Sequence, residues 1–104
     1  MGRLIHVAVF TWKPGTTDQE IQALRDGLAA LPGRIPDIRL FRFGADAGLR
    51  EGNADFAVVA EFDSPEDYRA YAAHPDHRAL IDRLIQPIVD RRTSLQLEAG
   101  EEGD

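Results

Sequence analysis

Residues 4–12 constrain the fold of this chain more than any other segment. Side chains of an extended segment alternate between two faces, and here both faces are apolar: one carries Ala8 and Phe10, the other Val7 and Val9. A strand that is apolar on both faces has to be covered from both sides. The chain has 104 residues, which is enough material for one hydrophobic core. One core covers one face of this strand, so something else has to cover the second face.

Capping residues and prolines delimit a helix and two strands after this first strand. Thr17 and Glu20 form a capping box, which predicts the start of a helix. The helix ends at Pro32, and its apolar stripe consists of Ile21, Leu24, Leu28 and Leu31. Two strands are expected at residues 38–44 and 54–62, joined by a long polar loop.

The second half of the chain predicts an interrupted helix and a last strand. Ser64 is suited to cap a helix that has proline at its first position. His74 interrupts this helix, because a residue before proline avoids helical angles. A further helical piece runs from about residue 76 to Pro87. Residues 88–97 are expected to form a strand, with one face made of Val89, Leu95 and Leu97.

The resulting order, β-α-β-β-α-β, is that of a ferredoxin-like α+β unit. Such a unit is a four-stranded antiparallel sheet with helices on one face, so its other face stays open. A large open apolar face usually marks an interface, and twofold dimers are the commonest assemblies. We therefore expect a homodimer in which two sheets pack face to face and close a barrel.

Composition narrows the classes of function. The chain has no cysteine, which excludes a disulfide scaffold, a Cys-ligated metal site and a thiol nucleophile. Its net charge of −6 argues against a nucleic-acid partner. No membrane-spanning run or signal peptide is recognisable, so we expect a cytoplasmic protein without a membrane partner. Four acids follow Leu97, which suggests a domain at residues 1–98 and an acidic disordered tail at residues 99–104.

Four segments together resemble one protein family over residues 3–97. They are the first strand with its early His6, the segment Leu31-Pro32-Gly33-Arg34-Ile35-Pro36, the strand within residues 55–64, and Tyr71-Ala72-Ala73-His74-Pro75-Asp76-His77. This combination resembles the stress-responsive A/B barrel (Dabb) family. The resemblance implies a dimeric α+β barrel built from two ferredoxin-like units, in agreement with the fold expected from the residues.

The resemblance also suggests an activity. Some members of the family are stress-associated proteins, and a plant member, olivetolic acid cyclase, closes a linear tetraketide by an aldol condensation that retains the carboxylate. Carried over to this sequence, the general base of that cyclase falls on His77, its assisting tyrosine on Tyr71 and a pocket histidine on His6. A further pocket histidine of the cyclase is replaced by Phe56 here, which leaves the polyketide substrate open.

Each catalytic candidate also has a structural interpretation. His77 at a helix start could be a base whose pKa the helix dipole lowers, or a residue that only caps or packs. Tyr71 could donate a hydrogen bond to an enolate, or simply fill the core. His6 could reach the same cavity or be a hydrogen-bonded core residue. We expect no metal site, because His74 and His77 flank a proline break and need not converge.

The remaining candidates concern ligand binding. Phe10 and Phe56 could line a pocket for a small apolar or aromatic ligand, although core packing can also explain them. His74 is grouped with this pocket, and its ring is also expected to satisfy backbone groups left free at the helix break. Arg39 and Arg42 could hold a substrate carboxylate or be solvated charges at a strand edge.

Three functions stay open at this level. The first is a cofactor-free cyclase or lyase that acts on a small ketide or aromatic substrate with His77 as general base. The second is a non-enzymatic stress-responsive or small-ligand-binding protein, and the third is a cofactor-independent monooxygenase-like barrel. None of the three assigns a cofactor. The first predicts loss of turnover in His77→Ala with the dimer intact, and measurement of O₂ consumption would distinguish the monooxygenase from it.

Overall fold

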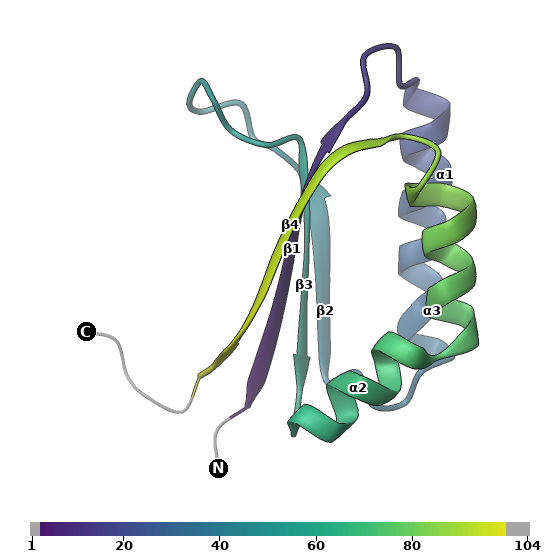
Figure 1. Cartoon of the computed structure of the whole chain (residues 1–104), viewed down its shortest axis with the longest axis vertical. Coiled ribbons are helices and arrows are strands. Elements are labelled where there is room, and N and C mark those ends of the chain that lie inside the picture. The colour runs from purple at the N-terminus through teal and green to yellow at the C-terminus, as the bar shows by residue number, and fades with distance from the viewer. Residues whose placement is uncertain (1–2, 100–104) are drawn as a thin grey trace.

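Residues 3–99 of the computed structural model are described here, and they form one antiparallel sheet with helices on a single face (Figure 1). The strands are β1 (Leu4–Trp12), β2 (Leu40–Ala45), β3 (Phe56–Phe62) and β4 (Val89–Glu98). The helices are α1 (Asp18–Ala30), the short 3-10 turn η1 (Leu31–Gly33), α2 (Pro65–Ala73), α3 (Pro75–Leu80) and the π-helical turn η2 (Ile81–Ile85). The chain therefore has the ferredoxin-like α+β fold that the element order predicts.

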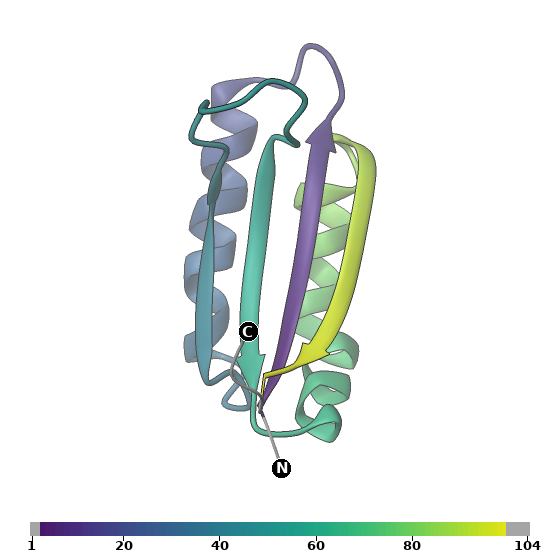
Figure 2. The ribbon, with the colours of Figure 1, turned by 90° about the vertical axis from the view of Figure 1, so that its left-hand side faces the viewer.

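The sheet has the order β2-β3-β1-β4, with every neighbouring pair antiparallel. Figure 2 shows the four strands side by side in front of the helices, with β1 and β3 in the centre. In this register Phe10 lies opposite Phe56 on β3 and opposite Arg92 on β4. The central position of β1 explains why its side chains on the helix side are so uniformly buried.

The core lies between the helices and one face of the sheet. Leu24 and Leu28 from the predicted stripe of α1 are buried there, against Phe56, Val58 and other residues of the central strands. The predicted helix starts are also confirmed: the capping box at Thr17 is complete, and Ser64 accepts a hydrogen bond at the start of α2. Local sequence signals thus set the ends of the helices, and apolar burial holds them on the sheet.

The other face of the sheet is largely apolar, and no helix within residues 3–99 covers it (Figure 1). On β1, Ile5 and Val7 are half-buried, and the register pairs them with Leu97 and Leu95 of β4. Leu95 is 53% exposed and Leu97 is 43% exposed. The two apolar faces predicted for residues 4–12 are therefore both present, but the described part of the chain covers only one of them.

One strand face differs from the prediction. Leu95 and Leu97 share the open face, whereas Val89 lines the cavity on the helix side. The reason is a bulge: Thr11 pairs with Arg91 and Trp12 with Val89, so Asp90 has no partner in the register. An extra residue in one strand reverses the alternation beyond it. Strict alternation along β4 therefore placed Val89 on the wrong face.

The element bounds shift by one or two residues at several strands. The second and third strands begin at Leu40 and Phe56, and the last ends at Glu98. Ala99 donates a backbone hydrogen bond to Arg3 (2.9 Å). Residues 100–104 of the predicted tail lie outside the described part of the chain. Within residues 3–99, no helix is long and apolar enough to cross a membrane.

Candidate active site

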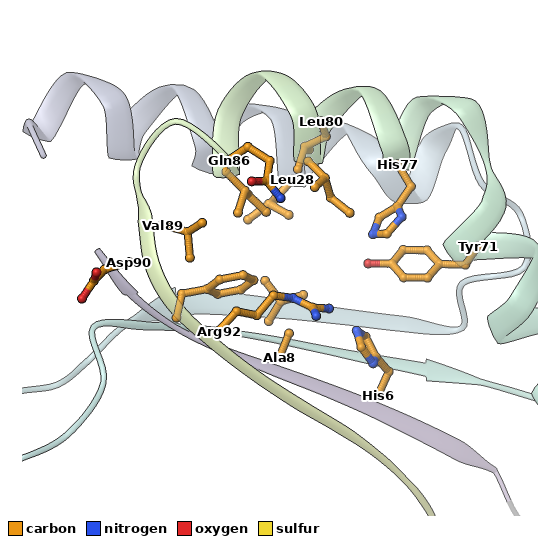
Figure 3. Close-up of a pocket in the computed structure, with 14 residues that line it drawn as sticks. His6, Ala8, Leu28, Tyr71, His77, Leu80, Gln86, Val89, Asp90 and Arg92 are labelled. Carbon is orange, nitrogen blue, oxygen red and sulfur yellow. The ribbon is translucent and has the colours of Figure 1, made fainter. Parts of the chain in front are cut away.

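A cavity of about 410 Å³ opens between the sheet and the helical segment that leads into β4. Its lining is mostly apolar, with contributions from Ala8, Leu28 and Leu80. Several polar side chains also face it: His6 from β1, Tyr71 from α2, His77 from α3 and Arg92 from β4 (Figure 3). An apolar cleft with a few convergent polar groups is the usual form of a small-molecule site.

The break between α2 and α3 brings Tyr71 and His77 together. His74 lies at this break with extended backbone angles, and its Nδ1 accepts a hydrogen bond from the backbone N–H of Asp76 (3.1 Å). The backbone N–H of His74 donates a hydrogen bond to the carbonyl oxygen of Tyr71 (3.1 Å). The turn places Tyr71 at the end of one helix and His77 at the start of the next, with ring centroids 4.1 Å apart. His74 therefore has the predicted structural role of satisfying backbone groups at the break.

His77 is set up as a hydrogen-bond acceptor toward the cavity. Its Nδ1 lies 3.3 Å from the carbonyl oxygen of Ala72, which can only accept, so Nδ1 carries the proton. The lone pair is then on Nε2, and Figure 3 shows that ring edge directed at the cavity. Burial lowers the pKa of His77, the bond to Ala72 opposes this, and the charges of Arg92 and Arg78 lower the pKa further. The imidazole is thereby kept neutral and free to accept a proton.

The physical cause of this lowered pKa differs from the expected one. The sequence suggested the dipole of the helix that begins near His77. In the structure α3 has only six residues, and desolvation of the half-buried ring is the largest influence. Tertiary packing, rather than the helix end, therefore sets the protonation state.

Tyr71 points its hydroxyl group into the same cavity. The residue is 2% exposed, and its ring contacts Phe62 with a centroid separation of 5.1 Å. Burial raises the pKa of the phenol well above its usual range, and the neighbouring Tyr68 raises it further. Tyr71 thus stays protonated at physiological pH and can act as a hydrogen-bond donor.

His6 is a buried residue of β1 that also faces the cavity. It is 4% exposed, and its Nδ1 is 2.9 Å from Nε2 of Gln96 on β4. With the Gln96 amide donating, Nδ1 accepts and the ring proton lies on Nε2, on the cavity side (Figure 3). Burial lowers the pKa of His6 to about 4, so the ring is neutral. His6 is therefore both a hydrogen-bonded core residue and a residue that faces the cavity.

Two of the predicted pocket residues lie elsewhere. Phe10 lines the cavity, but Phe56 is 2% exposed on β3 and packs against Trp12, with ring centroids 5.7 Å apart. His74 turns toward the backbone of α3 instead of the cavity. Their assignment to the ligand pocket is corrected accordingly: one ring fills the core, and the other caps a helix.

The two arginines considered for a substrate carboxylate are also remote from the cavity. Arg39 pairs with Asp63 at 3.4 Å on the surface. Arg42 is exposed and lies opposite Val59 on the open face of the sheet. Among residues 3–99, no three histidine or acidic side chains gather as metal ligands.

Sequence reasoning missed Arg92 and Gln96. Both lie on the helix side of β4, where Gln96 fixes His6 and Arg92 lines the cavity. The signal was available, because strand alternation puts even-numbered residues opposite the face of Leu95 and Leu97. The exposed, polar character of this stretch hid its connection to the site.

Comparison with known proteins agrees with this architecture. The profile of the Stress responsive A/B Barrel Domain family matches residues 4–99. The chain belongs to this family. It is 30% identical over 78 residues to the stress-response A/B barrel domain-containing protein HS1 of Arabidopsis thaliana, an alignment that covers 73% of this chain and 72% of the plant protein.

Solved structures with the same fold include members without an assigned function and one enzyme. A dimeric ferredoxin-like protein of unknown function from Thermobifida fusca is 39% identical, with a TM-score of 0.87 over 94% of this chain and 92% of that one. The hydroxynitrile lyase of Passiflora edulis has a TM-score of 0.86 over 99% of this chain and 98% of its own, at 16% identity. The latter likeness concerns the fold alone.

Proposed function

We propose that this member of the family is a cofactor-free enzyme that moves a proton at carbon in a small ketide or aromatic substrate, with His77 as general base. The observation that carries the proposal is the pairing of His77 and Tyr71 at one end of an apolar cavity, one ring a hydrogen-bond acceptor and the other a donor. A base and an adjacent donor are the groups needed to form and stabilise an enolate.

The proposed steps use only side chains that face the cavity. Nε2 of His77 removes a proton from a carbon next to a carbonyl, and the electron pair moves onto the carbonyl oxygen. The hydroxyl of Tyr71 and Nε2–H of His6 donate to that oxygen as its charge develops. In an aldol closure the carbanion carbon then bonds to a second carbonyl carbon of the same chain. The oxygen of that carbonyl takes up the proton from His77.

The lowered pKa of His77 supports this role. A base is effective near its own pKa, and a neutral imidazole is available over the whole physiological range. The apolar lining made by Leu28 and Leu80 limits the access of water to a carbanion. The Passiflora lyase shows that this fold carries lyase chemistry in one protein. Because the two sequences are only 16% identical, the substrate of the lyase is not assigned to this chain.

The test uses the carboxylate salt of a linear tetraketide built from acetate units, with ring closure followed by absorbance and mass spectrometry. Wild-type protein is expected to accelerate closure, and His77→Ala to lower the rate by a factor of about a hundred to ten thousand. Tyr71→Phe keeps the packing of the ring but removes the donor, and it is expected to cost about a hundredfold. Tyr68→Phe is the matched control, because Tyr68 contacts the same rings from outside the cavity lining.

Two results would reject the proposed enzymatic activity. Unchanged turnover in His77→Ala would show that His77 is not the base. Saturable binding of the tetraketide acid without any ring closure by wild-type protein would instead favour a small-ligand-binding protein. Circular dichroism of each variant shows whether the fold is retained.

We further propose that the protein is a homodimer that buries the open face of its sheet. The support is the row of apolar side chains on β1 and β4, in which Ile5 pairs with Leu97 and Val7 with Leu95. A pair of exposed leucines beside half-buried β-branched residues is typical of an interface. The Thermobifida protein, which is dimeric, agrees with this proposal.

A further inference from the structure

We propose that the cavity binds its substrate through a carboxylate, and that Arg92 is the residue that anchors it. This inference takes the cavity of the proposed function as its site and assigns the chemical class of its ligand. It stands on the position of Arg92, on its absence from the ion pairs within residues 3–99 and on the polar groups around it.

The position of Arg92 follows from the register of β4. Arg92 lies opposite Phe10, whose side chain is buried on the helix side, so Arg92 faces the same side. Figure 3 shows its guanidinium group beside Ala8 and directed toward Tyr71 and His6. A positive charge therefore stands next to the proposed reacting groups.

Arg92 is available for a ligand. The ion pairs found among residues 3–99 join Arg3 to Glu61, Arg39 to Asp63, and Arg69 to Glu66, and none involves Arg92. Within the described residues, the lining contains one acidic residue, Asp90, and Figure 3 shows its carboxylate at the far end of the cavity, pointing away from the guanidinium. Arg92 is exposed, so water solvates its charge while the cavity is empty.

The other polar groups of the cavity also favour an anion. Tyr71 and His6 present hydrogen-bond donors, and His77 presents the acceptor. The positive charge of Arg92 acts on both histidines, because it contributes to the lowered pKa of His6 and of His77. Neutral histidines leave Arg92 as the cation of this group, and a guanidinium binds a carboxylate with two parallel hydrogen bonds.

This geometry gives the substrate an orientation. A carboxylate held by Arg92 places the carbons next to it beside Tyr71 and His77, where a proton can be removed. The rest of the substrate then lies along the apolar wall of Leu28 and Leu80. A charged anchor and an apolar wall together select a small organic acid over an equally shaped neutral molecule.

The test compares three acids with their primary amides: benzoate, phenylacetate and phenylpropanoate, which set the carboxylate at increasing distances from the ring. Binding to the full chain is followed by NMR through the methyl groups of Ala8 and Val89, both in the cavity lining. For at least one pair, wild-type protein is expected to bind the acid about tenfold more tightly than the amide. Arg92→Gln is expected to remove this preference and to leave the affinity for the amide unchanged.

Arg39→Gln is the matched control, because it removes the same charge from a surface site outside the cavity. It is expected to preserve the preference for the acid. The inference is overturned if none of the three acids shifts the methyl signals to saturation. It is equally overturned if Arg92→Gln keeps the preference, or if Arg39→Gln loses it to the same extent.

The outcome is independent of the proposed activity, because these probes report binding without turnover. If wild-type protein fails to close the tetraketide acid while acid binding still depends on Arg92, the proposed activity fails and the carboxylate site stands. If ring closure depends on His77 but the acids bind without regard to Arg92, the activity stands and the anchor is rejected.

Discussion

Acidification should destabilise this protein through His6. Burial lowers the pKa of His6 in the folded chain from 6.5 to about 4. The unfolded chain therefore binds a proton at a higher pH than the folded chain does. The contribution of neutral His6 is fully present above the unfolded pKa, and it is lost as the pH falls from 6.5 toward the folded value. The residue is 4% exposed, so little solvent screening reduces the effect.

The magnitude follows from proton linkage. Protonation of His6 alone is expected to lower the free energy of unfolding by about 2 kcal/mol between about pH 7.5 and about pH 5. Carboxylates contribute little in this window, because their ordinary pKa values are about 4. His77 also has a lowered pKa and adds to the loss in the wild-type protein.

The assay is urea unfolding followed by circular dichroism, at equal protein concentration across this pH window, for the wild-type protein and His6→Asn. Asparagine keeps an acceptor for Gln96 but does not titrate. His77 is present in both proteins, so its contribution largely cancels in the difference between their pH slopes. The variant is expected to be less stable at neutral pH and to lose about 2 kcal/mol less on acidification. Equal slopes in the two proteins would refute the claim that buried His6 resists protonation.

Two further predictions concern the helix break and the open face. His74→Ala removes the side-chain cap of α3. It is expected to cost about 1 kcal/mol and a few degrees in Tm by calorimetry. His74→Asn should recover most of the loss, and an unchanged Tm in the alanine variant would contradict the capping role. Leu95→Asp places a charge on the open face and is expected to yield monomers in sedimentation equilibrium. Leu49→Asp is its control, in an exposed loop; a dimer that survives Leu95→Asp would argue against this interface.

Much of the fold could be predicted because it depends on local signals. The capping box at Thr17, the Ser64 cap and the break at His74 act through neighbouring backbone groups, so their residues are visible in the sequence itself. The two faces of residues 4–12 follow from the alternation of side chains along a strand. That Tyr71 and His77 act together was suggested by the resemblance to the family and not by a local signal.

The site as a whole depends on contacts between segments that are distant in sequence. Gln96 reaches His6 across 90 positions, and Arg92 reaches the cavity because β4 pairs with β1. The bulge at Asp90 turns Val89 toward the helix side of the sheet, and no local sequence pattern predicts this bulge. Phe56 looked equally suited to a pocket, yet packing against Trp12 places it in the core.

The sequence by itself determined which elements form, where the helices begin and break, and that both faces of the first strand need cover. Only the tertiary structure decided which side chains share the cavity and in which protonation state. Caps and alternation act over a few residues, so they can be recognised along the chain. Desolvation and charge act through space, and the pKa values of His6 and His77 therefore depend on what the folded sheet and helices bring around them.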